Sequence, residues 1–277
     1  MRLRETGLVA ARELREAARS RWFLLAAVCF LVLSLALAML GLAGAQRSGL
    51  AGFDRTTASV LNLALIFVPL VTLSLGGLSI AGELEDGSLA LLLAQPLTRL
   101  ETYVGKYLGL LAAVAASIFL GFGTTGIIIA AVAGGGDVRA FAALVALTLL
   151  LAAATLAIGT ALSVILRARA RVIGAALAVW LGLVYVSDLG TIGLTIARSL
   201  APGQVFALAL LNPVEQARVL GTLALTPRLE ILGPVGLFGL DHFGATGLVA
   251  MLLAALLATA AAPLAVGYAL FRRTPIT

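Results

Sequence analysis

The sequence predicts an all-α membrane protein with six transmembrane helices, and three observations support this. Hydrophobic residues make up 61% of the 277 residues and charged residues only 12%, whereas a soluble domain carries about 25% charged residues. Six apolar stretches are long enough to cross a bilayer as a helix, which takes about 20 residues. Basic residues gather at the ends of these stretches. We therefore expect a single transmembrane domain over residues 1–277.

The six predicted spans cover residues 22–45, 57–81, 107–133, 140–166, 172–196 and 247–271. An even number of spans places both termini on the same side of the membrane. Thirteen lysine and arginine residues lie in the N-terminal segment, the second and fourth connections and the tail, against six in the remaining connections. Because basic residues favour the cytoplasmic side, we expect both termini in the cytoplasm. The net charge of +6 is then a topology signal and does not indicate nucleic-acid binding.

Residues 1–21 predict an amphipathic helix that lies in the inner membrane interface before the first span. Its apolar face comprises Leu3, Ala11, Leu14, Ala18 and Trp22, and its charged face comprises Arg12, Glu16 and Arg19. This separation of faces at helical period is typical of interfacial helices. The alternative is a frayed, charged tail.

The connection 82–106 has the pattern of a short helix, a sharp turn and a new helix start. Three acidic residues come first: Glu83, Glu85 and Asp86. The apolar run 88–94 follows Gly87 and ends before Pro96, and these two residues punctuate a helix. Residues 98–101 (Thr-Arg-Leu-Glu) match a capping box at the start of the third span.

The only long connection on the other side covers residues 197–246. Asn212, Pro213 and Glu215 follow the order of a helix start, with a capping side chain, a proline and an acid in the first turn. We expect this helix, over 212–221, to lie on the outer surface. The glycine and proline residues after it predict turns, and about 50 residues are too few for an independent domain.

Small residues recur at a spacing of four in three helices: Gly105 and Gly109; Ala153, Ala157 and Ala161; Gly174, Ala178 and Gly182. Such ridges let helix backbones approach closely in lipid. Packing within one chain explains most of them, and a homodimer contact is the alternative for at least one.

The sequence offers no catalytic centre. An ATP-binding P-loop needs a glycine six residues before its lysine, and the chain's only lysine, Lys106, lacks one. A serine hydrolase would have to bring Ser79 to the sole histidine, His242, across the predicted membrane. The single Cys29 excludes an intrachain disulfide. We expect no catalytic residue, no metal site and no cofactor in this chain.

Asp188 is the ionisable residue within a predicted span. It lies about 16 residues into 172–196, which at 1.5 Å per residue is about 24 Å from the inner face. Ionisable residues at such depth are costly and are candidates for function. A hydrogen bond to a neighbouring span is an equally good explanation.

The connection 82–106 resembles the cytoplasmic coupling segment of ABC-2-type permeases, although Ser88 stands where threonine is usual. The resemblance implies a homodimer and a separate cytoplasmic ABC ATPase, which would bind ATP and Mg²⁺. It also implies that the ATPase is contacted through residues of this segment: Glu83, Glu85, Gly87, Leu89, Leu91, Leu92, Leu93, Pro96 and Arg99.

A narrower resemblance is to one branch of that family, the permeases that help mature the copper centre of nitrous oxide reductase. It rests on 180–185 with Asp188, on 211–215 with Arg218, and on 271–273. It implies a bacterial inner membrane and a periplasmic partner, which we expect to contact Asn212, Pro213, Glu215 and Arg218. Because the spans lack His, Cys and Met clusters, copper is not the expected cargo.

Two alternative functions remain from the sequence alone. One is a general ABC-2 exporter permease for a lipid, a drug or a peptide. The other is a membrane anchor or mechanical relay that transports nothing.

Overall fold

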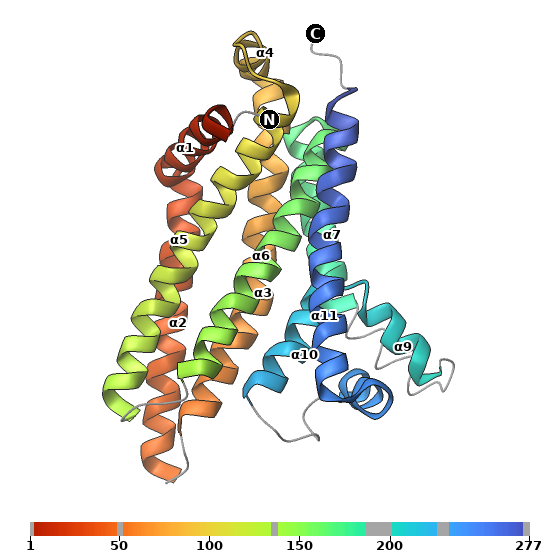
Figure 1. Cartoon of the computed structure of the whole chain (residues 1–277). Coiled ribbons are helices and arrows are strands. Elements are labelled where there is room, and N and C mark those ends of the chain that lie inside the picture. Colours follow the sequence, from red (N-terminus) through yellow and green to blue (C-terminus); the bar gives the residue numbers. More distant parts are fainter. Residues whose placement is uncertain (1–2, 49–51, 134–137, 187–200, 226–232, 274–277) are drawn as a thin grey trace.

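The computed structural model describes residues 3–48, 52–133, 138–186, 201–225 and 233–273, and every element in these ranges is helical. Within them, six helices are long and apolar enough to cross a membrane, which confirms the predicted fold class. The start of α1, the short helix α4 and the end of α11 lie at one end of the bundle (Figure 1). We call this the α4 end and the opposite one the α9 end.

Five of the six span helices are longer than the sequence predicted, and the fifth span is described over 169–186. The six helices are α2 (Arg21–Ser48), α3 (Gly52–Glu85), α5 (Arg99–Ala133), α6 (Val138–Leu166), α7 (Arg169–Leu181) with the π-helical turn η1 (Gly182–Val186), and α11 (Gly233–Phe271). The third span begins at Arg99 because the capping box forms. The Thr98 N–H donates to Glu101 Oε2 at 2.9 Å, and the Glu101 N–H donates to Thr98 Oγ1 at 3.2 Å.

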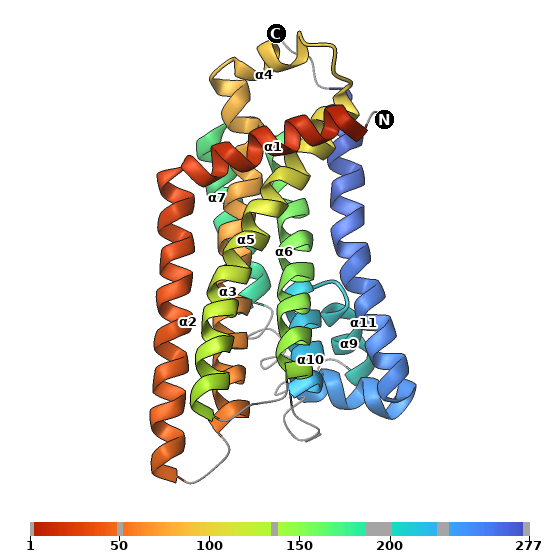
Figure 2. The same cartoon turned by 60° about the vertical axis from the view of Figure 1, so that its left-hand side comes forward.

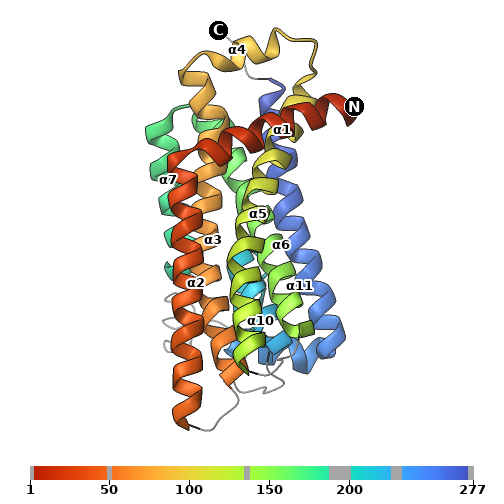
Figure 3. The ribbon, with the colours of Figure 1, turned by 90° about the vertical axis from the view of Figure 1, so that its left-hand side faces the viewer.

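Helix α1 (Leu3–Arg19) lies across the α4 end, over α5, and leads into α2 (Figures 2 and 3). Its buried face comprises Thr6, Val9, Glu13 and Ala17, while Leu3, Leu8 and Trp22 are exposed. Two glycines of α5 allow this close approach, since a Cβ at Gly109 would lie 2.5 Å from the Ala10 carbonyl oxygen. The ridge of Gly105 and Gly109 therefore serves packing within one chain.

Helices α3 and α6 form the tightest pair of the bundle. A Cβ at Gly159 would lie 2.6 Å from the Leu73 carbonyl oxygen, so the two backbones are nearly in contact. The hydroxyls of Thr72 and Thr155 lie 2.6 Å apart and are both buried. Hydroxyl groups paired in this way satisfy each other where water is absent. The pair forms the rigid centre against which the other spans pack.

The segment 197–246 differs most from the prediction, because it returns into the bundle. Helices α9 (Pro202–Ala209) and α10 (Pro213–Leu225) fold back beside the spans (Figure 1). Val214, Gln216 and Ala217 are at most 1% exposed, so α10 is not the outer-surface helix that the sequence predicted. The physical reason is that apolar residues surround most of α10, and a helix that is apolar on several sides buries them.

Asn212 holds the turn between α9 and α10 beside the π-helical turn. Its Oδ1 accepts the N–H of Val214 at 2.9 Å, which is the predicted cap, and its Nδ2 donates to the Leu183 carbonyl at 2.8 Å. This bond fixes the turn against η1, within a span. Irregular backbone at membrane depth is tolerated where protein buries it in this way.

The predicted turns after α10 are also absent from the described part of that region. Residues 233–243 form the first part of α11, and the helix breaks only at Gly244, whose φ of 68° and ψ of 172° suit glycine. Gly239 lies within the unbroken first part of α11. It packs against Phe206 and Leu248 at a place where any larger side chain would clash. Asp188 lies outside the described residues.

Candidate functional site

Helix α4 (Ser88–Leu93) has one buried face and one exposed face. It follows Gly87, whose φ of 72° is the left-handed conformation that reverses the chain after α3. Leu89 and Leu92 are 1% and 5% exposed and pack against the side chains of an apolar cluster: Ile80, Tyr103, Val164 and Phe271. Leu91 is 74% exposed.

The predicted coupling residues therefore do not share one surface. Leu89 and Leu92 hold α4 to the bundle, and Leu93 is half-buried. Ala90, Leu91 and Pro96 are exposed and form the outer face of the segment. The sequence could not separate these roles, because a six-residue run of apolar residues has no readable period. The face open to a partner is centred on Leu91.

Arg99 joins the coupling segment to the end of the last span. Its Nη1 donates to the carbonyl oxygens of Phe271 at 2.9 Å and Arg272 at 3.0 Å. These carbonyls end α11 and have no partner within their own helix. A guanidinium at a helix C-terminus also meets the negative end of the helix dipole. Arg99 thus fixes the start of α5, which follows α4, relative to the end of α11.

A second arginine joins the coupling segment to α7. Arg169 pairs with Asp86 and lies 3.7 Å from a carboxylate oxygen of Glu85, and its Nη2 also donates to the Gly82 carbonyl at 3.2 Å. The Arg169 N–H donates to Glu85 Oε1 at 3.0 Å. The two predicted acids, Glu85 and Asp86, therefore have partners within the chain.

Lys106 is the most buried charge at this end. Its ammonium lies 2.7 Å from Glu13 Oε2 on α1 and 3.0 Å from Glu83 Oε1 on α3. The side chains of Lys106, Glu13 and Glu83 are 2%, 9% and 14% exposed. Arg12 lies 3.5 Å from Glu83. We call Arg12, Glu13, Glu83 and Lys106 the Lys106 network.

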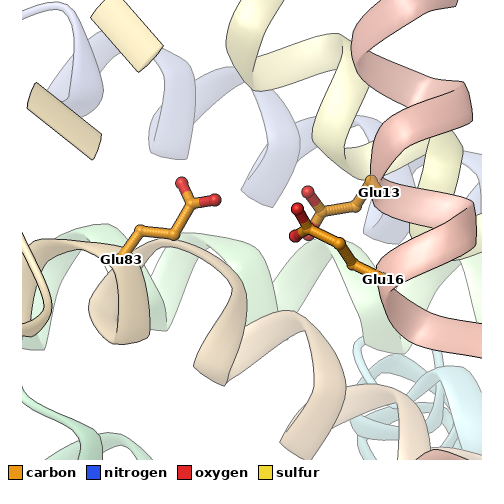
Figure 4. Close-up of side chains that lie close together, drawn as sticks. All are labelled: Glu13, Glu16 and Glu83. Carbon is orange, nitrogen blue, oxygen red and sulfur yellow. The ribbon is translucent and has the colours of Figure 1, made fainter. Parts of the chain in front are cut away.

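Burial raises the pKa of the Glu13 carboxyl, and the nearby ammonium of Lys106 opposes this rise. The carboxylates of Glu13 and Glu16 point from α1 towards Glu83 (Figure 4). Three carboxylate oxygens within 4.8 Å of one another could hold a metal ion. Lys106 and Arg12 supply two positive charges against these three carboxylates, so protein groups balance most of the negative charge of the cluster.

A cavity of about 380 Å³ opens beside these carboxylates. Its lining includes the acidic residues Glu13, Glu16 and Asp86 and the apolar residues Trp22 and Leu75. Ser79 also lines it, and its hydroxyl donates to the Gly76 carbonyl at 2.7 Å. His242 lies in the first part of α11 at the α9 end, so a Ser79–His242 catalytic pair does not form.

The residues expected to contact a partner at the α9 end lie mostly inside the chain. Asn212 and Pro213 are buried, and Glu215 and Arg218 pair with each other at 2.9 Å. Exposed residues there include Leu237, His242 and Phe243 in the first part of α11, and Leu208 and Leu211 at the end of α9 and just after it. This difference follows from the burial of α10.

Sequence reasoning missed the Lys106 network. Glu13 and Lys106 are 93 positions apart, and no local pattern connects them. One signal was available, because Lys106 is the only lysine among 19 basic residues. In a chain whose other basic residues are all arginine, a single lysine indicates a site that needs a compact ammonium group.

Comparisons with known proteins agree with the motif in 82–106. A family model described as "ABC-2 family transporter protein" matches residues 8–275. The "Probable ABC transporter permease protein NosY" of Pseudomonas aeruginosa is 32% identical over 97% of this chain and 98% of its own length. The protein of the same description from Stutzerimonas stutzeri is 32% identical over 96% of this chain and 97% of its own length.

Proposed function

Because this chain belongs to the ABC-2 transporter family and is an ABC transporter permease subunit, we propose that α4 couples it to a separate cytoplasmic ATPase. In this proposal the α4 end faces the cytoplasm. The single observation that carries it is the exposure of Leu91 on a helix that is otherwise fixed to the bundle. An apolar side chain in this setting fits a groove on a partner.

The fixed attachment of α4 supports a role in transmitting force. Leu89 and Leu92 anchor the helix, Arg99 joins the start of α5, just after it, to α11, and Arg169 joins the end of α3, just before it, to α7. A movement imposed on α4 by a partner would therefore be passed to two spans. ATP and Mg²⁺ would bind in the ATPase, and this chain needs no cofactor of its own.

We further propose that the permease works as a homodimer. A Cβ at Gly174 on α7 or at Gly182, where η1 begins, would meet nothing within 4 Å among the described residues, so in that part of the chain this small-residue ridge makes no helix contact, unlike that of Gly105 and Gly109. Small residues exposed on one helix let a second helix approach closely. A second copy of the chain would cover this ridge.

The likeness to the two NosY proteins supports a role in maturing the copper centre of nitrous oxide reductase at the outer face of a bacterial inner membrane. A periplasmic partner would then dock at the α9 end. The buried position of α10 moves the proposed contact from Glu215 and Arg218 to Leu237, His242 and Phe243. The second candidate function is that of a general ABC-2 exporter permease, which would transport a lipid, a drug or a peptide.

Co-purification with the ATPase tests the coupling proposal. We expect Leu91→Glu to abolish retention of the cytoplasmic ABC ATPase co-expressed with this chain, because it places a charge in an apolar contact. Leu91→Met is the matched control and should retain the ATPase, since it conserves volume and polarity. Both variants should fold, because residue 91 is exposed. Undiminished ATPase retention by Leu91→Glu would refute the proposal.

A further inference from the structure

We infer that Lys106 is a positioning residue that holds α1 against both ends of the coupling segment, so that α1 moves with α4 when the ATPase acts. This inference rests on the proposed function. The inference adds to the proposed function by assigning a part in the coupling to α1, a helix outside the coupling segment.

The Lys106 network joins three elements at one ammonium. Glu83 lies near the end of α3, five residues before α4 begins, and Lys106 lies in α5, seven residues after that helix begins. Glu13 reaches the same ammonium from α1. The two carboxylates thus connect α1 to the chain on either side of α4, at distances of 2.7 and 3.0 Å.

The surroundings of Lys106 are built for this contact. Gly105 and Gly109 flank it on α5, and a Cβ at Gly105 would lie 2.7 Å from the Cβ of Val9. The two glycines let α1 lie directly on α5, beside Lys106. A lysine ammonium is compact and has three donors, so it can serve two carboxylates from different helices.

A buried ion pair fixes position more narrowly than apolar contact does. The ammonium must keep both carboxylates within hydrogen-bonding distance, because an uncompensated charge in this buried place is costly. Apolar side chains, by contrast, tolerate small shifts along a helix surface. Because α1 continues into α2, a shift of α1 carried by this contact would reach the first span.

The experiment measures the distance between α1 and the coupling segment by spin labelling. Gly7 has open space around it and Gln95 is exposed, so Gly7→Cys and Gln95→Cys in a Cys29→Ala background provide the label sites. In the complex with the ATPase, we expect one narrow distance distribution that a non-hydrolysable ATP analogue leaves unchanged. In Lys106→Met with Glu13→Met, we expect a distribution at least twice as wide that shifts with the nucleotide.

The double variant replaces the ion pair by apolar side chains, which usually preserves folding. Glu83 keeps Arg12 as a partner in it. The matched control is Glu16→Gln, one turn away on α1, where the side chain is 51% exposed; Glu16 pairs with Arg12 at 2.7 Å, a bond that a glutamine oxygen can still accept, while the ammonium of Lys106 pairs with Glu13 and Glu83. We expect this control to behave as the unchanged chain does. If the double variant does not fold, Glu13→Gln replaces it and should widen the distribution too.

A narrow, nucleotide-independent distribution in the variant without the ion pair would overturn the inference. The same distance measurement on the chain without the ATPase tests the inference about Lys106 independently of the proposed coupling to the ATPase. If the unchanged chain failed to bind the ATPase, the coupling proposal would fail. The Lys106 network would still be judged by whether the distribution widens when the ion pair is removed.

Discussion

The two ends of the bundle differ in their ionic contacts, although aromatic rings pack at both, as Tyr103 and Phe271 do at the α4 end with ring centroids 5.7 Å apart. At the α4 end, arginine and lysine side chains join separate helices: Lys106 joins α1, α3 and α5, Arg99 joins α5 to α11, and Arg169 joins α7 to α3. At the α9 end, aromatic rings make the corresponding contacts. Phe206 of α9 lies between Phe238 and Phe243 of α11, with ring centroids 5.4 and 5.8 Å apart.

This difference matters because the two kinds of contact transmit movement differently. Charge-assisted hydrogen bonds have preferred distances and directions, so helices joined by them move together. Ring contacts are satisfied over a range of offsets and tilts, so helices joined by them can adjust. We interpret the α4 end as the part that receives a defined movement. The α9 end is then the part that adapts to what it meets.

The largest expected effect tests the buried face of α4. Leu92→Glu would bury a carboxylate among Ile80, Tyr103 and Phe271, at a cost of several kcal/mol, on the order of 3–5. We expect a low yield of folded protein and a clearly lower melting temperature in detergent. Leu91→Glu should leave the melting temperature unchanged. Equal melting temperatures for the two variants would contradict the two-faced description of α4.

The second effect concerns the aromatic contacts at the α9 end. Phe206 is 4% exposed, and Phe206→Ala should destabilise the packing of α9 by about 3 kcal/mol through the cavity it leaves. Hydrogen exchange at the amides of α9 and of 235–243 should rise. Retention of the ATPase should be unaffected, because the change is confined to the far end. Loss of the ATPase would show that the two ends are not separable in this way.

Sequence patterns predicted what depends on neighbours along the chain. The capping box at Thr98, the cap at Asn212 and the break at Gly87 all form, because each needs only three or four consecutive residues. The six spans follow from length and apolarity alone.

What the sequence could not supply depends on pairs that are distant along the chain. The burial of α10 depends on packing with α3, α6 and α11, and an outer-surface position was inferred from one apolar face only. The inward side of α4 was equally hidden, since it is set by Phe271, about 180 residues later. The ATPase contacts expected of Leu89 and Leu92 stay a prediction, and the burial of both side chains makes Leu91 the sharper test.

The smallest expected effect separates exposed charge pairs from buried ones within the α4 end. Arg169 is 46% exposed and its partners Glu85 and Asp86 are 41% and 56% exposed, so water and salt screen these pairs. Exposed pairs contribute about 0–1 kcal/mol each, and Arg169→Gln should lower the melting temperature only slightly.

The effect of Arg169→Gln should also shrink as the ionic strength rises from about 0.05 to 1 M, because the Debye length falls to about 3 Å. Lys106→Met leaves Glu13 buried without its partner, so it should cost several times more at every ionic strength. Melting temperatures of both variants across this salt series provide the measurement. Equal losses with the same salt dependence would mean that the Lys106 network is no more protected than a surface pair. Helix α1 would then be free to move apart from the coupling segment.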